Sequence, residues 1–296
     1  MSGPVETSVI IPSYNRPQQL AACLEAVVAQ QDERPFEVVV VDDGSRVPLF
    51  DVCARFGDRV RVVRQENAGP AAARNRAVKE ARGVFLAFTD DDCRPRPGWL
   101  SALRMAHTGQ PNRIVGGVIV NGRPRDPYAT ASQDLADYLY DYYGAADGTA
   151  PFFTTNNMGC TRTAFLDLGG FDESFGRNGA EDRDFGMRWR EAGRELILCP
   201  EAIVDHHHEM TLREFFRQHA NYGRGAFHLH GVMRARGSSL PKVEPLRFYL
   251  ELVAWPVRRN GVRRLPSTVL MGLTQVAMVA GYTQARFRAR RMATGL

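Results

Sequence analysis

The chain has 296 residues, of which 44% are hydrophobic and 24% charged, so it can bury a large core and does not have the composition of a disordered protein. Five cysteines occur singly without a CxxC pair, and the first residues lack the basic region of a secretory signal, which favours a reducing compartment. Residues 231–296 contain 12 Lys and Arg and only 2 acidic residues, which leaves a charge of −5 on residues 1–230 and argues against nucleic-acid binding.

Two β-α-β units are predicted in the first 88 residues. The runs SVIIP and FEVVVVD are short and β-branched, which is typical of strands buried on both faces of a parallel sheet. Between them, residues 17–30 begin with proline and carry apolar side chains at helical spacing. The strand RVRVVRQ, an Ala-rich helix and the strand VFLAF repeat the pattern. This alternation predicts an α/β fold with a doubly wound sheet, whose ligand crevice lies at the carboxyl ends of the strands.

Three consecutive aspartates, Asp90, Asp91 and Asp92, follow the last of these strands. Adjacent carboxylates repel one another, so they either spread into solvent as a loop or are held together by a hard cation. Asp42 and Asp43 end another strand, and the polar segment PSYNRP ends a third. Because these strand ends should open into one crevice, the sequence favours a cation and ligand site there.

A second acidic centre lies in NGAEDRDFGMRWREAG. Its acidic residues Glu181, Asp182 and Asp184 precede apolar residues at helical spacing, which predicts the first turn of an amphipathic helix. Acidic residues in a first turn are also favoured by the helix dipole, so a purely structural role stays open at this point.

Six segments resemble, in order, successive blocks of the inverting family 2 glycosyltransferases of the GT-A fold, over about residues 7–230. They are SVIIPSYNRPQQLAACLEAVVAQ, EVVVVDDGS, NAGPAAARNRA, FLAFTDDDC, TTNNMGCTRTAFLDLGGFDESF and GAEDRDFGMRWREAG. The resemblance implies a Rossmann-like mixed sheet flanked by helices and an enzyme that uses a nucleotide-diphosphate sugar, of which UDP-sugars are the more common in the family. A nucleotide-sugar-binding scaffold subunit or a related nucleotidyltransferase is the alternative.

The resemblance also assigns donor-side residues. Asp90 and Asp92 match the outer positions of the family's DxD motif and would hold Mn²⁺ or Mg²⁺, which neutralises the diphosphate leaving group. The residues implied to bind the nucleotide sugar are Pro12, Tyr14, Asp43, Arg74, Asp90, Asp91 and Asn157.

On the acceptor side, Asp182 matches the family's general base and Glu181 its neighbour or orienter. Inversion needs one base on the acceptor hydroxyl and charge neutralisation on the leaving group, without a covalent intermediate. By the same resemblance, a turn borders the acceptor, and its residues are Gly170, Phe171 and Asp172.

Two further segments are assigned less directly. Three histidines in a row either form a solvated loop or supply a metal ligand, and alignment on TLREFF selects His206 first and His208 second. Arg224 in YGRG either reaches a phosphate or belongs to a segment whose glycines end a helix. No QxxRW motif and no block of several transmembrane helices is present, so transfer of a single sugar to a carbohydrate or lipid-linked acceptor is favoured.

The C-terminal segment is predicted to be helical. Residues 265–285 carry no charge, and arginines flank them on both sides. Three alternatives remain: a helix on an anionic membrane surface, a core or oligomer helix, and a single span. We therefore expect a GT-A domain at residues 1–230 and a basic helical extension at residues 231–296, in a cytoplasmic protein that is peripheral to the membrane in the first alternative.

Overall fold

The computed structural model describes residues 4–32, 34–144, 152–240 and 244–294, and the chain divides into two compact units. The first, here called the sheet unit, comprises Met1–Gly122, Tyr143–Gly176 and Glu181–His207. The second, the helical unit, comprises Arg123–Tyr142, Arg177–Ala180 and His208–Leu296. The predicted domain division between residues 230 and 231 lies inside the continuous helix α8 (Leu212–Arg236), and it stays a prediction.

The sheet unit contains one eight-stranded mixed sheet with the order β3-β2-β1-β4-β7-β6-β8-β5. Its strands are β1 (Thr7–Ser13), β2 (Phe36–Asp42), β3 (Val60–Arg64), β4 (Phe85–Phe88), β5 (Cys93–Pro95), β6 (Arg113–Asn121), β7 (Met158–Thr161) and β8 (Glu195–His206). Its α-helices are α1 (Pro17–Val28), α2 (Phe50–Ala54), α3 (Pro70–Glu80), α4 (Trp99–His107), α6 (Arg162–Asp167) and α7 (Glu181–Glu191). Both predicted β-α-β units are present.

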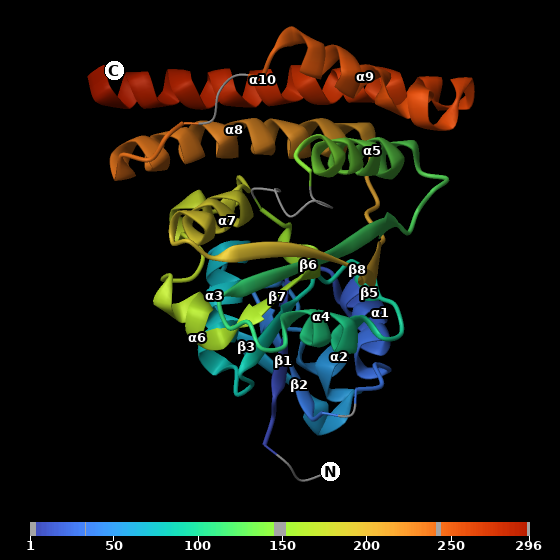
Figure 1. Ribbon diagram of the computed structural model, residues 1–296, viewed down its shortest axis with the longest axis vertical. Helices are drawn as coiled ribbons and strands as arrows, with labels where there is room; N and C mark the ends of the chain where they lie inside the picture. The colour runs from blue at the N-terminus through green and yellow to red at the C-terminus, as the bar shows by residue number, and fades with distance from the viewer. Residues whose placement is uncertain (1–3, 33, 145–151, 241–243, 295–296) are drawn as a thin grey trace. The chain divides into compact units, whose positions relative to one another are not determined.

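Apolar side chains on both faces of β1 explain why this strand lies inside the sheet. Val9 and Ile11 pack with α1, α2 and α4 in one core cluster, and α3 contacts β1 and β2 as well. In Figure 1, α1, α2 and α4 lie on one side of the sheet, and α3 and α6 lie on the other. The sheet is therefore covered on both faces, as the uninterrupted β-branched runs predict.

Parallel pairing brings three polar strand ends to one edge. β1 pairs with β2 and β4, and Ser13 lies opposite Asp42 at the end of the register. Thr89 alone separates Phe88, the last residue of β4, from the acidic run. As expected from the sequence, the acidic run and the acidic end of β2 open at the same edge.

At the other edge of the sheet, the acidic run leads directly into β5, which is antiparallel to its neighbour. β5 pairs with β8 in antiparallel register, with Cys93 opposite His206. The backbone N–H of His207 also donates to the carbonyl oxygen of Asp92 at 2.8 Å. This pairing fixes the end of the acidic run against the end of β8.

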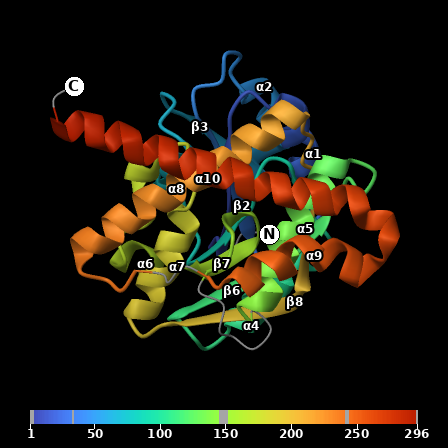
Figure 2. The ribbon, with the colours of Figure 1, turned by 90° about the horizontal axis from the view of Figure 1, so that it is seen from above.

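The helical unit contains α5 (Pro127–Tyr142), α8, α9 (Leu246–Asn260) and α10 (Leu265–Thr294). Thr211 and Glu214 form a reciprocal capping box that begins α8, and Gly237 ends the helix in a left-handed conformation with φ 73°. α8 and α10 cross closely, as Figure 2 shows, with Gly223 and Gly281 at the contact. A Cβ on Gly281 would overlap the carbonyl oxygen of Ala220, so this approach needs a residue without a side chain.

We expect Gly281→Ala to lower the free energy of unfolding of the helical unit by about 1–3 kcal/mol, because the new methyl group meets backbone that cannot move away without separating the helices. Gly272→Ala, in the same helix, is the matched control, because a Cβ at Gly272 would meet no atom within 4 Å. It should be neutral or raise stability by about 0.5–1 kcal/mol. Urea unfolding followed by far-ultraviolet circular dichroism measures both variants, and equal stability of the two would contradict the close crossing.

Candidate active site

The acidic run divides into residues with different surroundings. Asp91 and Asp92 are buried, with 4% and 8% of their surface exposed, and Asp90 is only partly buried. The hydroxyl of Ser13 donates to Asp91 at 2.7 Å, and Arg16 Nη1 donates to Asp91 at 3.1 Å and to Asp92 at 2.9 Å. Burial, only partly offset by Arg16, raises the pKa of Asp91 to about 7. Asp91 is therefore held inside the protein by the end of β1 and the start of α1.

Arg74 on α3 links the two acidic centres that the sequence singled out. Only 4% of its surface is exposed, and its Nη2 donates to Asp90 Oδ1 at 2.6 Å. Its Nη1 donates to Glu181 Oε1 at 3.0 Å. The acidic run and the beginning of α7 thus share one buried guanidinium.

The second acidic centre begins α7, as predicted. Glu181 is 6% exposed, and burial together with the neighbouring Asp182 raises its pKa, while Arg74 opposes the shift. Burial also raises the pKa of Asp182, which Arg183 only partly opposes. Asp184 differs, because it pairs with Arg188 at 2.8 Å, which continues to the carbonyl oxygens of Leu168 and Gly170. Arg188, paired with Asp184, thereby holds the turn that follows α6.

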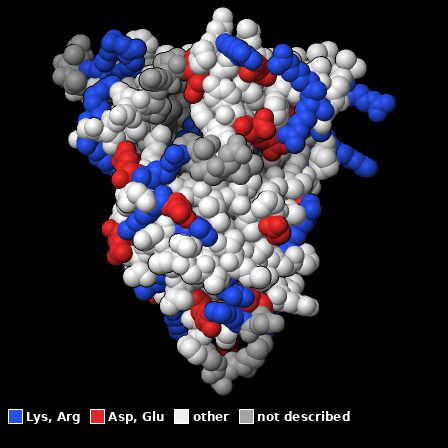
Figure 3. Space-filling model, viewed as in Figure 1, with Lys and Arg blue, Asp and Glu red and all other residues white. Residues whose placement is uncertain are grey.

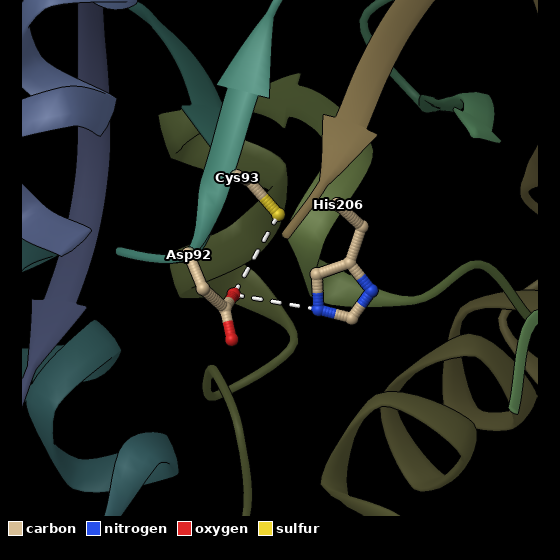
Figure 4. Close-up of side chains that lie close together, drawn as sticks. All are labelled: Asp92, Cys93 and His206. Atoms are coloured by element: carbon tan, nitrogen blue, oxygen red, sulfur yellow. Dashed lines mark hydrogen bonds and ion pairs between the residues drawn. The ribbon is translucent and has the colours of Figure 1, made fainter. Parts of the chain in front are cut away.

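Three side chains that could hold a metal ion lie together at the end of the acidic run. Asp92, Cys93 and His206 offer ligand atoms within 4.8 Å of one another, and His206 Nε2 lies 3.4 Å from Asp92 Oδ1 (Figure 4). Burial raises the pKa of Cys93 well above its usual range, so its thiol stays neutral and is a poor ligand for a hard cation. Carboxylate oxygen and imidazole nitrogen suit Mn²⁺, so Asp92 and His206 fit such an ion.

The predicted nucleotide residues lie at two neighbouring strand ends of the same edge: Pro12 is the second-last residue of β1, Tyr14 begins the loop after β1, and Asp43 begins the loop after β2. The side chain of Asn15 accepts from Arg46 N at 2.7 Å, which ties these loops together. Tyr14 is 41% exposed, whereas Asp43 is buried.

Asp43 also holds the segment that leads into α3. Its carboxylate accepts hydrogen bonds from Gln65 Nε2 at 2.8 Å and from the backbone N–H groups of Ala68 and Gly69 at 2.9 Å each. Gly69 has φ 94°, and a Cβ there would lie 2.7 Å from the carbonyl oxygen of Gly176. Asp43 therefore sets the start of the helix that carries Arg74.

Asn157 lies in the core and not beside the acidic run. Its side chain accepts from Trp99 Nε1 at 2.8 Å and donates to the carbonyl oxygens of Val118 and Ala202 at 2.9 Å each. Only 1% of its surface is exposed, and both amide hydrogens are used within the protein. Contact between Asn157 and the sugar donor stays a prediction. In this structure the amide oxygen and both amide hydrogens of Asn157 are already hydrogen-bonded within the protein.

The predicted acceptor turn is also built into the fold. Phe171 is 2% exposed and packs among Phe88, Phe165 and Phe185, while Gly170 is buried. Asp172 accepts from the backbone N–H of Ser174 at 2.9 Å. These contacts give the turn a structural role, and its role toward an acceptor stays a prediction.

Two predicted residues belong to the helical unit. His208 is in that unit, whereas Asp92 and His206 share the sheet unit. Arg224 donates to Gln284 Oε1 at 2.9 Å and also contacts Asn221. The predicted metal contact of His208 and phosphate contact of Arg224 are not tested by these arrangements.

Comparison with known proteins identifies the family. Residues 8–169, more than half of the chain, match the model of the family described as "Glycosyl transferase family 2". The chain belongs to glycosyl transferase family 2. A pre-mycofactocin glycosyltransferase from Mycobacterium tuberculosis is 30% identical over 285 residues, which cover 92% of this chain and 57% of the relative. A validoxylamine A glucosyltransferase from Streptomyces hygroscopicus subsp. limoneus is 30% identical over 237 residues, covering 69% and 52%.

The chain spans between half and two thirds of the length of those relatives. A solved mannosyltransferase from Pyrobaculum calidifontis, in complex with GDP-Man and Mn²⁺, is similar with a TM-score of 0.63 at 20% identity. The match covers 98% of this chain and 81% of the mannosyltransferase. The predicted GT-A fold, with its mixed sheet and long C-terminal helix, is confirmed.

The sequence alone did not single out Arg16 and Ser13 as partners of the acidic run. Both lie in PSYNRP, the segment chosen for its polar strand end, but their partners are 75 to 78 residues away. The one signal that could have identified Arg16 is that it is a basic residue at a strand end predicted to lie beside acidic ones.

We expect Arg74→Met to lower the free energy of unfolding by about 3–5 kcal/mol near neutral pH, because Asp90 and Glu181 lose their shared cation. The pKa of Glu181 already lies above its ordinary 4.5, and removing Arg74 raises it further. A raised folded-state pKa costs stability as pH rises through the window between the unfolded and folded values. The stability that Arg74→Met loses relative to the wild type should therefore become smaller toward acid pH, where the carboxyls bind protons.

Arg113→Met is the control for this prediction, because Arg113 pairs with Glu195, whose side chain is 61% exposed. Its loss should cost less than about 1 kcal/mol at every pH. Urea unfolding at several pH values measures both variants. A small deficit for Arg74→Met that does not change with pH would contradict the role given to this residue.

Proposed function

We propose that the protein is a metal-dependent inverting glycosyltransferase that moves one sugar from a nucleotide-diphosphate sugar to a hydroxyl group. A UDP-sugar is the proposed donor, and a carbohydrate or lipid-linked molecule is the proposed acceptor, as in the synthesis of cell-surface glycans. The observation that carries this proposal is the link from Asp90 through Arg74 to Glu181 within one unit, since it joins a donor-side carboxylate to the acceptor-side helix.

The donor side uses the end of the acidic run. Asp90, Asp92 and His206 would hold Mn²⁺ or Mg²⁺, and the bound ion would supply positive charge to the diphosphate as it leaves. The mannosyltransferase of similar fold was solved with GDP-Man and Mn²⁺, which supports a divalent ion here. Pro12, Tyr14 and Asp43 would line the site of the nucleotide base, next to the loop that Asp43 holds.

The acceptor side uses Asp182 as general base. Its carboxylate would take the proton of the acceptor hydroxyl as the hydroxyl oxygen forms the new bond to the sugar and the bond to the diphosphate breaks. Burial raises the pKa of Asp182, which makes its carboxylate a stronger base than an exposed aspartate. Glu181, held by Arg74, would orient the beginning of α7.

The proposed location is the cytoplasm. All five cysteines are free and buried, which suits a reducing compartment. A donor built on a nucleotide diphosphate is consistent with that location.

We expect Mn²⁺ to strengthen the binding of UDP by about ten-fold or more, because the ion offsets the charge of both the carboxylates and the diphosphate. Asp92→Ala should remove most of this gain. Asp205→Ala is the matched control, since Asp205 pairs with Arg96, which directly follows β5, and lies outside the acidic run. Isothermal titration with UDP, GDP and dTDP, with Mn²⁺ or with a chelator, measures the effect, and equal affinities in both conditions would refute metal dependence.

We expect Asp182→Asn to keep donor affinity near the wild-type value and to slow transfer by about 10²–10⁴-fold, because the amide cannot accept the proton. Glu191→Gln, at the exposed end of the same helix, is the control and should leave transfer unchanged. The wild-type rate should fall on acidification at a higher pH than an ordinary aspartate would cause, since the base must be ionised and its pKa is raised. Transfer that survives Asp182→Asn would show that another group is the base.

A further inference from the structure

Helix α10 has a buried face that is fully committed to the helical unit. The residues buried along it recur every three or four positions, and they are Ser267, Met271, Thr274, Ala277 and Gly281. α10 contacts α5, α8 and α9, and the glycines at its crossing with α8 bring the two backbones together. This half of the helix is therefore explained by packing within the unit.

The opposite half of α10 is apolar and exposed. At 100° per residue, the exposed apolar residues lie about half a turn from the buried ones. They are Leu265 (60% exposed), Val269 (68%), Val276 (61%), Val279 (64%) and Phe287 (65%). On α9, Leu246 and Leu250 are likewise 73% and 63% exposed. We call the five exposed apolar residues of α10 the apolar stripe, and folding of the described chain leaves it uncovered.

Basic side chains lie at both ends of the apolar stripe of α10. Arg258, Arg259 and Arg263 precede the helix and are exposed, as are Arg286, Arg288, Arg290 and Arg291 near its other end. In Figure 3, Lys and Arg side chains gather at the upper left and upper right of the picture, toward the two ends of α10 in the same view of Figure 1. Only two acidic residues occur between residues 231 and 296, so the segment that contains α9 and α10 carries a large excess of positive charge.

A membrane span by α10 conflicts with its packing. By length and composition alone, the segment Val262–Met292 could cross a bilayer: an 18-residue window within it has a mean hydropathy of 1.2, and 28% of that window is buried inside the protein. The buried face is held against α8, which carries Arg213, Arg217 and Arg224. Crossing would either separate the two helices or take these charges toward hydrocarbon, and both are costly.

Charge repulsion disfavours a dimer in which a second copy of the chain packs on the stripe. Pairing two α10 helices in either direction brings the arginines at an end of one helix beside arginines of the other. Like charges across a contact oppose association. An anionic lipid surface instead offers hydrocarbon to the stripe and negative headgroups to both basic ends.

We infer that the helical unit docks on anionic membranes, with α10 lying in the plane of the interface and its apolar stripe among the upper acyl chains. The docking needs no sugar donor and no metal, so it holds independently of the proposed reaction.

The test is co-sedimentation of the full-length protein with phosphatidylcholine vesicles, with and without phosphatidylserine, at low and high salt. We expect binding that requires phosphatidylserine and weakens with salt. Val276→Ser with Val279→Ser should weaken partitioning about ten-fold, and Arg288, Arg290 and Arg291→Gln should weaken it at least as much at low salt.

Matched controls carry the same chemical changes on the sheet unit. Val47→Ser with Val84→Ser changes valines that are 75% and 67% exposed, and Arg55, Arg59 and Arg82→Gln removes the same charge. Both controls should partition like the wild type. Melting temperatures identify any variant that fails to fold, and carbonate extraction should release the bound protein, as it does for a protein that does not span.

Several results would overturn the inference. Equal partitioning of the valine variant and the wild type would remove the stripe from the contact. Binding that resists carbonate would indicate a span. A dimer in light scattering that the valine variant abolishes, without vesicle binding by the wild type, would make the stripe an interface between copies.

Discussion

The buried guanidinium of Arg74 is the interaction on which the candidate site depends. An arginine this deeply buried is stable only with its charge compensated, and the two carboxylates that compensate it come from different motifs, Asp90 after β4 and Glu181 at the beginning of α7. Because both carboxylates bind one planar group, the separation between the two motifs is fixed. Asp43 contributes to the position of Arg74 indirectly, because it holds the loop from which α3 begins.

The site concentrates negative charge at some cost in stability. Asp91 and Glu181 are buried, and the pKa of each is raised, so their ionised forms are disfavoured in the folded protein. Arg16 and Arg74 limit this cost from opposite sides of the acidic run. Clusters of carboxylates with raised pKa values beside two cations are typical of sites that bind a cation or move a proton, which is why this edge of the sheet carries the functional proposal.

The fold and the acidic strand ends were predictable because they rest on local patterns. Apolar runs of strand length, an Ala-rich helix and strand-terminal acids are visible in a single sequence, and parallel pairing then places the strand ends at one edge. The contacts that decide individual roles were not predictable in this way. The donor role of Asn157 stays a prediction from its motif, and its hydrogen bonds to α4, β6 and β8 join residues 39 to 58 positions apart, which no local pattern indicates. Arg16 was overlooked, because its carboxylate partners are distant in sequence.

Stereochemistry tests the central claim most directly, since donor-side carboxylates and a single acceptor-side base suffice only for one displacement at the sugar carbon. Proton NMR of the product, recorded early in turnover with an accepted nucleotide sugar, reports the configuration of the new glycosidic bond. A single displacement predicts a configuration inverted relative to the donor. A product with the donor's configuration would contradict the roles proposed for Asp182 and the acidic run.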